Sequence, residues 1–535
     1  MNMNKQLALL GMTALASASA VPSMAKPKTS GTRPNIILIM VDDMGYSDIQ
    51  CYGGEIPTPN INRLAASGVK YTQFYNTARS CPTRASLITG LYPHQAGIGE
   101  MSEDPGSSVM PEDDSDGYMA ALNRHCVTMA EVLGDAGYHT YMVGKWHLGM
   151  HGMEKWPLQR GFDRFYGILA GATSYFAPHD GRGLYEDNTK LPVPEQPYYT
   201  TDAFTDKALE FLDTRKDNDP FFLYVAYNAP HWPLHAKQED IDKFIGKYDQ
   251  GWQKTREERR QRMIDLGLVK PEWGLAEWEN RTWDQLTPEE QKNSSLRMSV
   301  YAAQIYAMDY NVGKILDYLE KNDLRDNTLI VFLSDNGACA EPYSETGFGT
   351  VKEINNPKNW VQPSYGKPWA QVSNTPYRKY KVRAYEGGIS TPLILSWPEK
   401  YAKYSGSWRN NVGFLPDIMA TFVDVSGAEY PAVYHNGSEI YPMEGSSLCP
   451  TVTNPKKSIH DYIYGEHFDN RYVRWQNWKA VYDEQGKKWE LYDIDNDRTE
   501  RNDLAESKPE ILADLVDHWQ KWADTHHVYP KRPKK

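Results

Sequence analysis

Residues 80–90 of this 535-residue chain read Ser80-Cys81-Pro82-Thr83-Arg84-Ala85-Ser86-Leu87-Ile88-Thr89-Gly90. Pro82 suits the first turn of an α-helix, so the Ser80 side chain is expected at a helix N-terminus. Free backbone N–H groups at such an end favour an anion. An ordinary helix start without a chemical role is the alternative interpretation of the same residues.

On either side of this stretch, short apolar runs alternate with helical patterns. This alternation predicts an α/β fold, in which a mixed, largely parallel sheet is flanked by helices. The predicted buried strands are 35–41, 138–143, 221–227, 328–333 and 392–397. The predicted helices are 59–67, 300–320 and 411–425, and a charged, Trp-rich stretch at about 247–296 is expected to be a helical insertion.

After about residue 453 the pattern changes to short, closely spaced segments at 461–466, 471–475, 478–482 and 489–492. Their alternation is typical of an antiparallel sheet, and a helix is predicted at 509–524. The expected organisation is a signal peptide at 1–25, a large α/β domain at 32–452 and a smaller C-terminal α+β subdomain at 453–535.

The start of the chain has the pattern of a secretory signal. Lys5 precedes an apolar run at 7–16 and a series of small residues, and cleavage is expected after Ala20 or Ala25. The run is too short to span a bilayer and no later stretch is long enough, so no transmembrane anchor is expected. These features predict export, to the periplasm of a Gram-negative bacterium.

Charge and cysteine content restrict the partners. A net charge of −12 disfavours nucleic acid or an extended polyanion and favours a small anionic substrate held by a local basic cluster. Cysteines are few and scattered, without the spacing of a disulfide framework or a metal site: Cys51, Cys81, Cys126, Cys339 and Cys449.

Polar clusters follow the predicted strands, where open α/β sheets bind ligands. Asp42 and Asp43 follow the first strand, and Asp335 and Asn336 follow the strand at 328–333. Adjacent buried carboxylates repel each other unless a cation lies between them. The oxygen donors suit Ca²⁺ and not zinc. A turn or a helix cap would explain either pair taken alone.

Two further strands end in basic groups. Lys145 and His147 follow one, and His231 follows the other, with His235 as a neighbour of undefined role. A lone histidine is usually structural. Two histidines and a lysine at the ends of neighbouring strands favour acid–base and anion-binding roles.

Together these motifs resemble those of the formylglycine-dependent sulfatases of the alkaline phosphatase superfamily, across nearly the whole chain from Pro34. In that signature, Cys or Ser is followed two residues later by Pro, four later by Arg and ten later by Gly. Ser80 occupies the first position, so the resemblance is to the Ser-type bacterial arylsulfatase and carbohydrate sulfatase branch, with Cys81 out of register. It implies that a radical-type maturing enzyme oxidises Ser80 to formylglycine (3-oxoalanine). The lysine expected five residues before Glu386-Gly387-Gly388 is Lys381, although Arg378 and Lys379 lie close to it.

The resemblance also implies a division of roles. One Ca²⁺ would be bound by Asp42, Asp43, Asp335, Asn336 and the modified Ser80. Arg84 would stabilise the formylglycine, and Lys145 and Lys381 would hold the sulfate. His231 would protonate the leaving oxygen, and His147 would remove a proton from the second hydroxyl of the aldehyde hydrate.

The expected substrate is a sulfated carbohydrate, cleaved from a terminal sugar of a host glycan. Sulfated galactose or N-acetylgalactosamine is favoured. Candidate sugar contacts are His179, Asp180, Glu341 and Glu345, with Arg471 or Arg474 of the C-terminal subdomain. Two alternatives stay open: a phosphatase or phosphodiesterase on the same fold with unmodified Ser80, and a non-catalytic glycan-binding protein. The Asp335-Asn336 pair counts against the two-zinc sites of the phosphatases.

Overall fold

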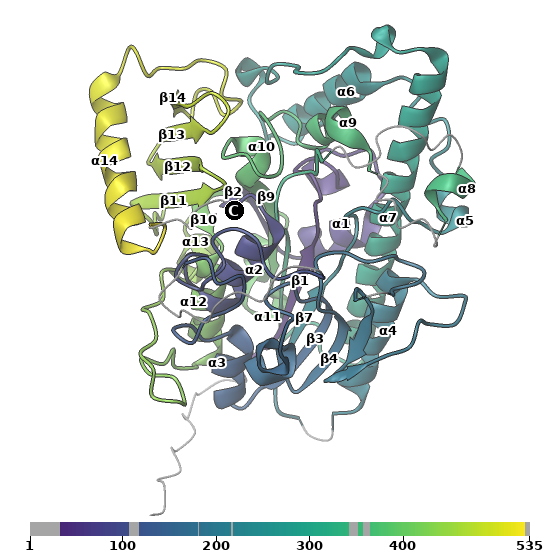
Figure 1. Ribbon diagram of the computed structural model, residues 1–535, viewed down its shortest axis with the longest axis vertical. Coiled ribbons are helices and arrows are strands. Elements are labelled where there is room, and N and C mark those ends of the chain that lie inside the picture. Colours follow the sequence, from purple (N-terminus) through teal and green to yellow (C-terminus); the bar gives the residue numbers. More distant parts are fainter. Residues whose placement is uncertain are drawn as a thin grey trace, which may run out of the picture.

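The computed structural model describes residues 33–105, 117–179, 181–215, 218–341, 351–356 and 364–529. These residues form a ten-stranded sheet between two layers of helices, with a four-stranded sheet packed beside it (Figure 1). In this part of the chain, no helix combines the length and the apolar character needed to cross a membrane.

The large sheet is mostly parallel at its centre, where β1 (Asn35–Val41) lies between β7 (Phe221–Ala226) and β8 (Thr328–Ser334) and runs parallel to both. Further out, β9 (Ser390–Ser396) pairs antiparallel with β8 and with β2 (Val69–Tyr75). Across the sheet the order is β10 (Trp408–Phe414), β2 (Val69–Tyr75), β9 (Ser390–Ser396), β8 (Thr328–Ser334), β1 (Asn35–Val41), β7 (Phe221–Ala226), β3 (His139–Lys145), β4 (Arg164–Ile168), β5 (Leu184–Glu186) and β6 (Thr189–Lys190). The predicted α/β fold is therefore confirmed.

Both faces of the sheet are covered because successive side chains of a strand point to opposite sides. Ile37 and Ile39 of β1 pack into the core on one face of the sheet, beneath α1 (Pro59–Ala66), α4 (Thr200–Asp213) and α7 (Pro288–Lys321) (Figure 1). Ile36 and Leu38 pack into the core on the other face, beneath α2 (Ser80–Thr89), α3 (Met129–Asp135) and α12 (Pro416–Ser426). The helices are α1 (Pro59–Ala66), α2 (Ser80–Thr89), α3 (Met129–Asp135), α4 (Thr200–Asp213), α5 (Gln238–Ile241), α6 (Trp252–Asp265), α7 (Pro288–Lys321), α8 (Val351–Ile354), α9 (Gly366–Ser373), α10 (Glu386–Ile389), α11 (Pro398–Tyr401), α12 (Pro416–Ser426), α13 (Cys449–Thr453) and α14 (Pro509–Thr525).

Two predicted helices have different limits in the structure. The segment 411–425 is not one helix: β10 pairs with β2 as far as Phe414, and α12 begins at Pro416, where the missing N–H of proline costs no hydrogen bond. The helix expected to begin at residue 300 begins at Pro288. Thr287 and Glu290 form a capping box there, so the Trp-rich insertion contains α6 and the first turns of α7.

The C-terminal residues form the predicted antiparallel sheet, and α14 packs across it. Its strands are β11 (Tyr462–His467), β12 (Asn470–Trp475), β13 (Trp478–Asp483) and β14 (Lys488–Asp493). Tyr75 and Phe414 of the large domain share a buried cluster with Val473 and Trp519 of this subdomain. The domain limit at residue 453 stays a prediction.

A buried group of charges joins the two sheets. Lys479 Nζ of β13 lies 3.0 Å from Glu386 Oε1 of α10 and 2.8 Å from Glu500 Oε1. Arg498 donates from Nε to Glu386 Oε2 at 2.8 Å. All four side chains are buried. The short helix that follows Lys381 is thereby anchored to the C-terminal subdomain.

Candidate active site

Parallel pairing of β1 with β8 brings two acidic segments together. Val41 is in register with Ser334, so Asp42 and Asp335 leave the sheet side by side. The backbone N–H of Asp335 donates to Val41 O at 3.0 Å, and that of Asp43 donates to Asp335 Oδ1 at 3.0 Å. Asp43 has a φ of 66°, where the chain leaves the extended conformation. Asp42 and Asp43 therefore lie at one site with Asp335.

Ser80, the first residue of α2, points at these carboxylates. Its Oγ lies 2.7 Å from Asp42 Oδ1 and 2.5 Å from Asp335 Oδ2. The hydroxyl has one hydrogen to donate, so the two carboxyl groups need either one further proton or a cation between them. Burial and the charge of Asp42 raise the pKa of Asp335 to about 8.

Two buried cations surround the same serine. Lys145, at the end of β3, places Nζ 2.6 Å from Asp42 Oδ2 and 3.3 Å from Ser80 Oγ. Arg84 lies one turn along α2 and approaches Asp335 Oδ2 at 3.4 Å. Burial alone would raise the pKa of Asp42, but the positive charges of Lys145, His231 and Arg84 hold it well below its usual value. Asp42 is therefore the ionised member of the pair.

Asp43 accepts hydrogen bonds from a second set of side chains. Lys381 donates from Nζ to Asp43 Oδ2 at 2.9 Å, and Asn336 donates from Nδ2 to Asp43 Oδ1 at 2.7 Å. Burial acts against the charge of Lys381, yet Asp43 and Glu341 raise the pKa of its ammonium group above the usual value. Lys381 is thus held protonated at the site.

The structure distinguishes Lys381 from the neighbouring basic residues. Arg378 pairs with Glu490 at 3.1 Å, and Lys379 pairs with Glu279 at 2.7 Å. Of these three side chains, Lys381 is the one that contacts the aspartates at the ends of the strands.

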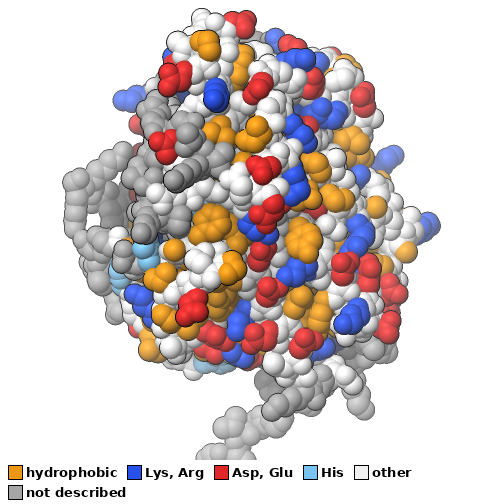
Figure 2. Space-filling view, turned by 90° about the vertical axis from the view of Figure 1, so that its right-hand side faces the viewer, with side chains coloured by type: hydrophobic (Ala, Val, Ile, Leu, Met, Phe, Trp, Pro, Cys, Tyr) orange, Lys and Arg blue, Asp and Glu red, His pale blue; other side chains and the backbone are white. Residues whose placement is uncertain are grey.

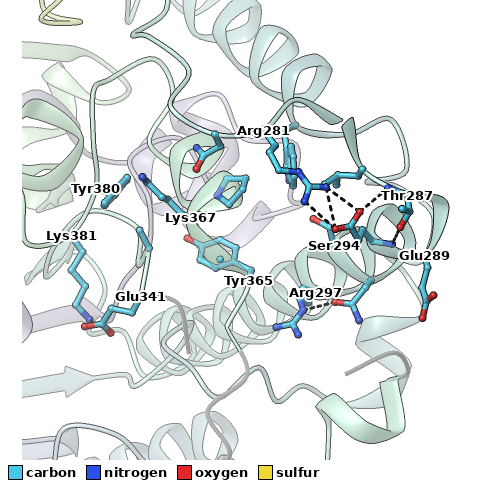
Figure 3. A pocket seen from close by; sticks show the side chains of 18 of the residues that line it. Arg281, Thr287, Glu289, Ser294, Arg297, Glu341, Tyr365, Lys367, Tyr380 and Lys381 are labelled. Carbon is cyan, nitrogen blue, oxygen red and sulfur yellow. Dashed lines mark hydrogen bonds and ion pairs between the residues drawn. The ribbon is translucent and has the colours of Figure 1, made fainter. Parts of the chain in front are cut away.

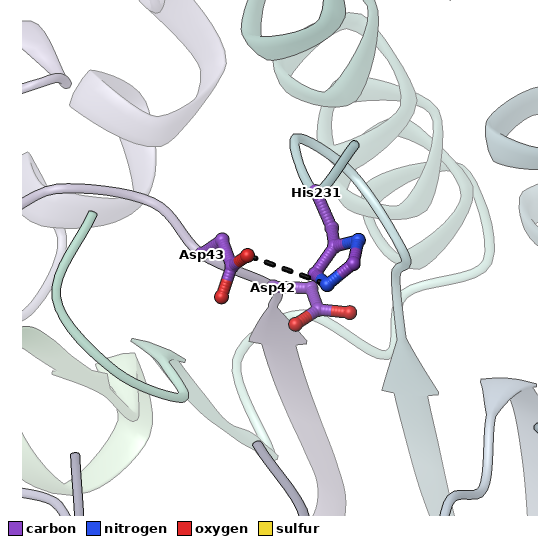
Figure 4. Close-up of side chains that lie close together, drawn as sticks. All are labelled: Asp42, Asp43 and His231. Carbon is purple, nitrogen blue, oxygen red and sulfur yellow. Dashed lines mark ion pairs between the residues drawn. The ribbon is translucent and has the colours of Figure 1, made fainter. Parts of the chain in front are cut away.

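The group Asp42, Asp43 and His231 fits a metal site (Figure 4). One potential ligand atom of each lies within 4.8 Å of the others, and all three side chains are buried. Asn336 Oδ1 is also buried and accepts no hydrogen bond from the described residues. Carboxylate and amide oxygens dominate the set, which is the donor chemistry of a hard divalent cation. Of the predicted ligands, Asp42 and Asp43 belong to this group, and its third member is His231, which was predicted as an acid and not as a ligand.

His231 reaches this group from the loop after β7. Its Nδ1 lies 2.6 Å from the carbonyl oxygen of Trp232, so Nδ1–H is the donor there. Nε2 then faces Asp43 Oδ2 at 3.4 Å. Burial lowers the pKa of His231, although the charges of Asp43 and Asp42 act in the opposite direction.

His147 lies in a buried environment close to two positive charges. Burial, followed by the charges of Lys145 and Arg84, lowers its pKa well below the usual value, so the neutral imidazole is favoured. Its Nδ1 is buried and has no hydrogen-bond partner among the described residues. Gly171 makes room for the ring, because a Cβ there would lie 2.6 Å from His147 Nε2. A neutral, buried histidine can accept a proton.

Glu341 lies beside the same site and contacts two residues that were not predicted from the sequence. Arg79 approaches Glu341 Oε1 at 2.7 Å, and Trp232 donates from Nε1 to Oε2 at 3.0 Å. Lys381 is 3.6 Å from the same carboxylate. In the sequence, Arg79 directly precedes Ser80 and Trp232 directly follows His231. These neighbouring positions were the signal from which both residues could have been predicted.

The other predicted contacts differ in position. His179 is half-buried, whereas Asp180 and Glu345 lie outside the described residues. Arg474 is buried in the subdomain interface, where it contacts the Tyr75 hydroxyl. Arg471 lies over the rings of Tyr482 and Trp519. A sugar-binding role for these residues stays a prediction.

Cys81 does not share the position of Ser80. It is buried, its Sγ lies 3.4 Å from Glu100 O, and it accepts from the backbone N–H of Ser102 at 3.2 Å. None of these contacts involves the aspartates.

Comparison with known proteins identifies the family. The sulfatase family model matches residues 34–428, and the model described as N-sulphoglucosamine sulphohydrolase, C-terminal, matches residues 377–524. The chain is 37% identical to an arylsulfatase of Klebsiella aerogenes over 435 residues, which cover 78% of this chain and 91% of that protein. It is 33% identical to an uncharacterized sulfatase of Schizosaccharomyces pombe, over 91% of this chain and 93% of that protein.

Among solved structures, the chain is similar to Ps i-CgsB in complex with k-i-k-neocarrahexaose. The TM-score is 0.68 and the identity 28%, over 92% of this chain and 93% of the other. The family model spans the whole set of strand ends described above, including Ser80, Lys145, His231 and Asp335. The chain belongs to the sulfatase family of the alkaline phosphatase superfamily and is a sulfuric ester hydrolase.

Proposed function

We propose that this protein is an exported sulfatase that removes sulfate from a terminal sugar of a host glycan. Sulfated galactose or N-acetylgalactosamine is the favoured substrate. One Ca²⁺, bound by Asp42, Asp43, Asp335 and Asn336, and a formylglycine made from Ser80 complete the site. The observation that carries the proposal is the position of Ser80 at the start of α2, within 2.7 Å of Asp42 and 3.3 Å of Lys145.

The surroundings of Ser80 suit a nucleophile. Oxidation of Ser80 would supply an aldehyde whose hydrate has two hydroxyl groups in place of one. Asp42 and Asp335 are placed to accept hydrogen bonds from oxygens on this side chain. Arg84 contacts Asp335 and the carbonyl of Lys145, so it holds both in position. In the reaction, Ca²⁺ would supply positive charge for the oxygens that become more negative.

Lys145 and Lys381 bracket the position expected for sulfate. Each pairs with a different aspartate, Asp42 or Asp43, and each is buried. Preorganised cations in a water-poor site stabilise the charge that develops on the sulfate oxygens. Each ammonium group is already held in place by its aspartate, so neither lysine has to be ordered during the reaction.

The two histidines suit opposite proton transfers. With Nδ1–H bound to the Trp232 carbonyl, a proton on His231 is held at Nε2, which faces Asp43 and is the atom proposed to protonate the leaving oxygen. His147 is favoured in its neutral form and is the proposed proton acceptor. General acid–base assistance of this kind contributes about 10²–10⁴-fold to a rate.

Two observations support a sugar sulfate and export. The similar solved structure, Ps i-CgsB, is in complex with a neocarrahexaose, an oligosaccharide. The sequence begins with the pattern of a secretory signal, which we propose directs the protein to the periplasm of a Gram-negative bacterium. Ser at position 80 would require a radical-type sulfatase-maturing enzyme as a partner.

Intact-mass analysis combined with a sulfate-release assay tests the proposal. Protein produced together with a bacterial maturing enzyme should lose two hydrogens at Ser80, located by peptide fragmentation. It should also release sulfate from 4-nitrophenyl sulfate and from 6-sulfated N-acetylgalactosamine. Protein that releases sulfate with an unmodified Ser80 would contradict the formylglycine mechanism, and a cytoplasmic protein that keeps residues 1–25 would contradict export.

A further inference from the structure

A long cavity opens directly from the proposed sulfate position (Figure 3). At one end it is lined by Lys381 and Glu341, which also contact the site itself. At the other end it is lined by Arg281 and Thr287, ahead of α7. Tyr380 and Lys367 lie between these ends (Figure 3). The cavity is therefore a continuation of the candidate active site.

Its size exceeds what one sugar ring requires. The volume is about 910 Å³. This is close to the upper end of the range of about 300–1,000 Å³ for sites that enclose drug-sized ligands. A single sulfated monosaccharide at Lys381 would leave most of this space to solvent. The geometry suits a substrate that continues beyond the ring that carries the reacting sulfate.

The lining is also more positive than the protein as a whole. Among the described lining residues, five are basic and three are acidic, within a chain of net charge −12. The face shown in Figure 2 carries acidic and basic side chains interspersed, without a large patch of one sign. The positive excess is therefore local, as expected for a cleft that concentrates an anionic ligand.

Most basic groups of the cleft already have an acidic partner. Arg281 pairs with Glu290 at 3.0 Å, and Arg383 pairs with Asp483 at 3.1 Å. Lys381 is held by Asp43.

Lys367 differs from these groups. Within the part of the chain that the structure describes, its ammonium group forms no ion pair, and it lies 5.7 Å from the centre of the Tyr380 ring. Both side chains are half-buried. A half-buried ammonium beside an aromatic ring can bind an anionic group while the ring packs against a sugar.

We infer that this cleft binds the continuation of a sulfated oligosaccharide, with Lys367 holding a second sulfate group and Tyr380 supporting a sugar ring. The inference rests on the proposed sulfatase function, because it places the reacting sulfate at Lys381. It specifies that the preferred substrate carries at least two sulfates on different sugar rings.

Binding measurements test the inference without requiring the modified residue. In a Ser80→Ala background, calorimetry would compare a galactose-based tetrasaccharide that carries two sulfates with the same tetrasaccharide carrying one. The disulfated ligand should bind more tightly. Lys367→Ala should weaken its binding by about tenfold or more, because a hydrogen bond to a charged group contributes about 1.5–3 kcal/mol. Lys367→Arg should restore binding.

Lys254→Ala is the matched control, since this exposed lysine of α6 lies outside the cleft lining. It removes the same charge and should leave both affinities unchanged. Equal affinity of the protein for the two tetrasaccharides, or equal weakening by Lys367→Ala and Lys254→Ala, would overturn the inference.

Activity on a small substrate separates this inference from the proposed function. In the matured enzyme, Lys367→Ala should keep the kcat and KM for 4-nitrophenyl sulfate and raise KM for the disulfated tetrasaccharide. A loss of uniform binding changes KM and not kcat. Loss of activity on 4-nitrophenyl sulfate as well would contradict the role of Lys367. An unmutated enzyme that releases no sulfate from any of these esters would contradict the proposed function instead.

Discussion

Ser80 at the start of α2 donates a hydrogen bond of 2.7 Å to Asp42 at the end of β1, although 38 residues separate them in the chain. The bond joins the residue proposed to become the nucleophile to the central strand of the sheet. Burial acts to raise the pKa of Asp42, but the positive charges of Lys145, His231 and Arg84 hold it well below its usual value, which favours the ionised carboxylate. A change at Ser80 is therefore expected to affect chemistry much more than the packing of the core.

Ser80→Ala should reduce turnover of 4-nitrophenyl sulfate by on the order of 10⁵-fold or more, because the nucleophile is removed. The melting temperature should change little, and circular dichroism would check that the fold is retained. Cys81→Ser serves as the neighbouring control. It should keep both the oxidation of Ser80 and most of the activity. A Ser80→Ala enzyme with substantial activity would refute the assignment of the nucleophile.

Removal of the metal should lower both activity and thermal stability. A ligand that binds only the native state stabilises it by about 2.7 kcal/mol when the free ligand concentration is 100 times Kd. A chelator removes this contribution. Calcium should restore both properties, and Asn336→Ala should weaken the restoration because it removes the buried Oδ1. Elemental analysis measures the metal content. Stoichiometric zinc, with activity recovered by zinc alone, would contradict the calcium assignment.

His231→Ala should affect sugar sulfates far more than 4-nitrophenyl sulfate. Protonation of the leaving oxygen matters most for a basic alkoxide, whereas nitrophenolate leaves readily without it. The kcat for a sugar sulfate is expected to fall by about 10²–10⁴-fold. His147→Ala is the comparison variant, and it should slow both substrates to a similar degree. Equal losses on both substrates for His231→Ala would exclude its role as the acid.

Lys479→Met should strongly destabilise the protein. It would leave Glu386 and Glu500 buried without their ammonium partner, and breaking a buried pair in this way costs about 3–5 kcal/mol. Lys488→Met on the adjacent strand β14 removes an exposed ion pair with Asp503 and should cost about 1 kcal/mol or less. Urea denaturation followed by tryptophan fluorescence compares the two variants. A similar shift in the urea midpoints of both variants would show that the buried ion pairs add little to the free energy of unfolding.

Much of the sheet could be predicted from the local sequence because its central strands are apolar on both faces. The run 35–41 matches β1 residue for residue, and 221–227 differs from β7 only at its last residue. Uninterrupted β-type apolar runs bounded by polar turns are a strong local signal. At 411–425 one helix was predicted, because the apolar residues of β10 and α12 adjoin there. Only the pairing of β10 with β2 separates the strand from the helix.

The sequence by itself determined the family signature and so the residues that we propose carry the chemistry, because Ser80, the paired aspartates and the basic residues occur in a recognisable order. It also determined where most strands lie. Only the tertiary structure decided which of these groups meet. Parallel pairing of β1 with β8 sets Asp42 beside Asp335, and the loop before α10 brings Lys381, and not Lys379, to Asp43. It also placed Arg79 against Glu341 and the cleft beyond them, because contacts between residues distant in sequence depend on how the whole chain packs.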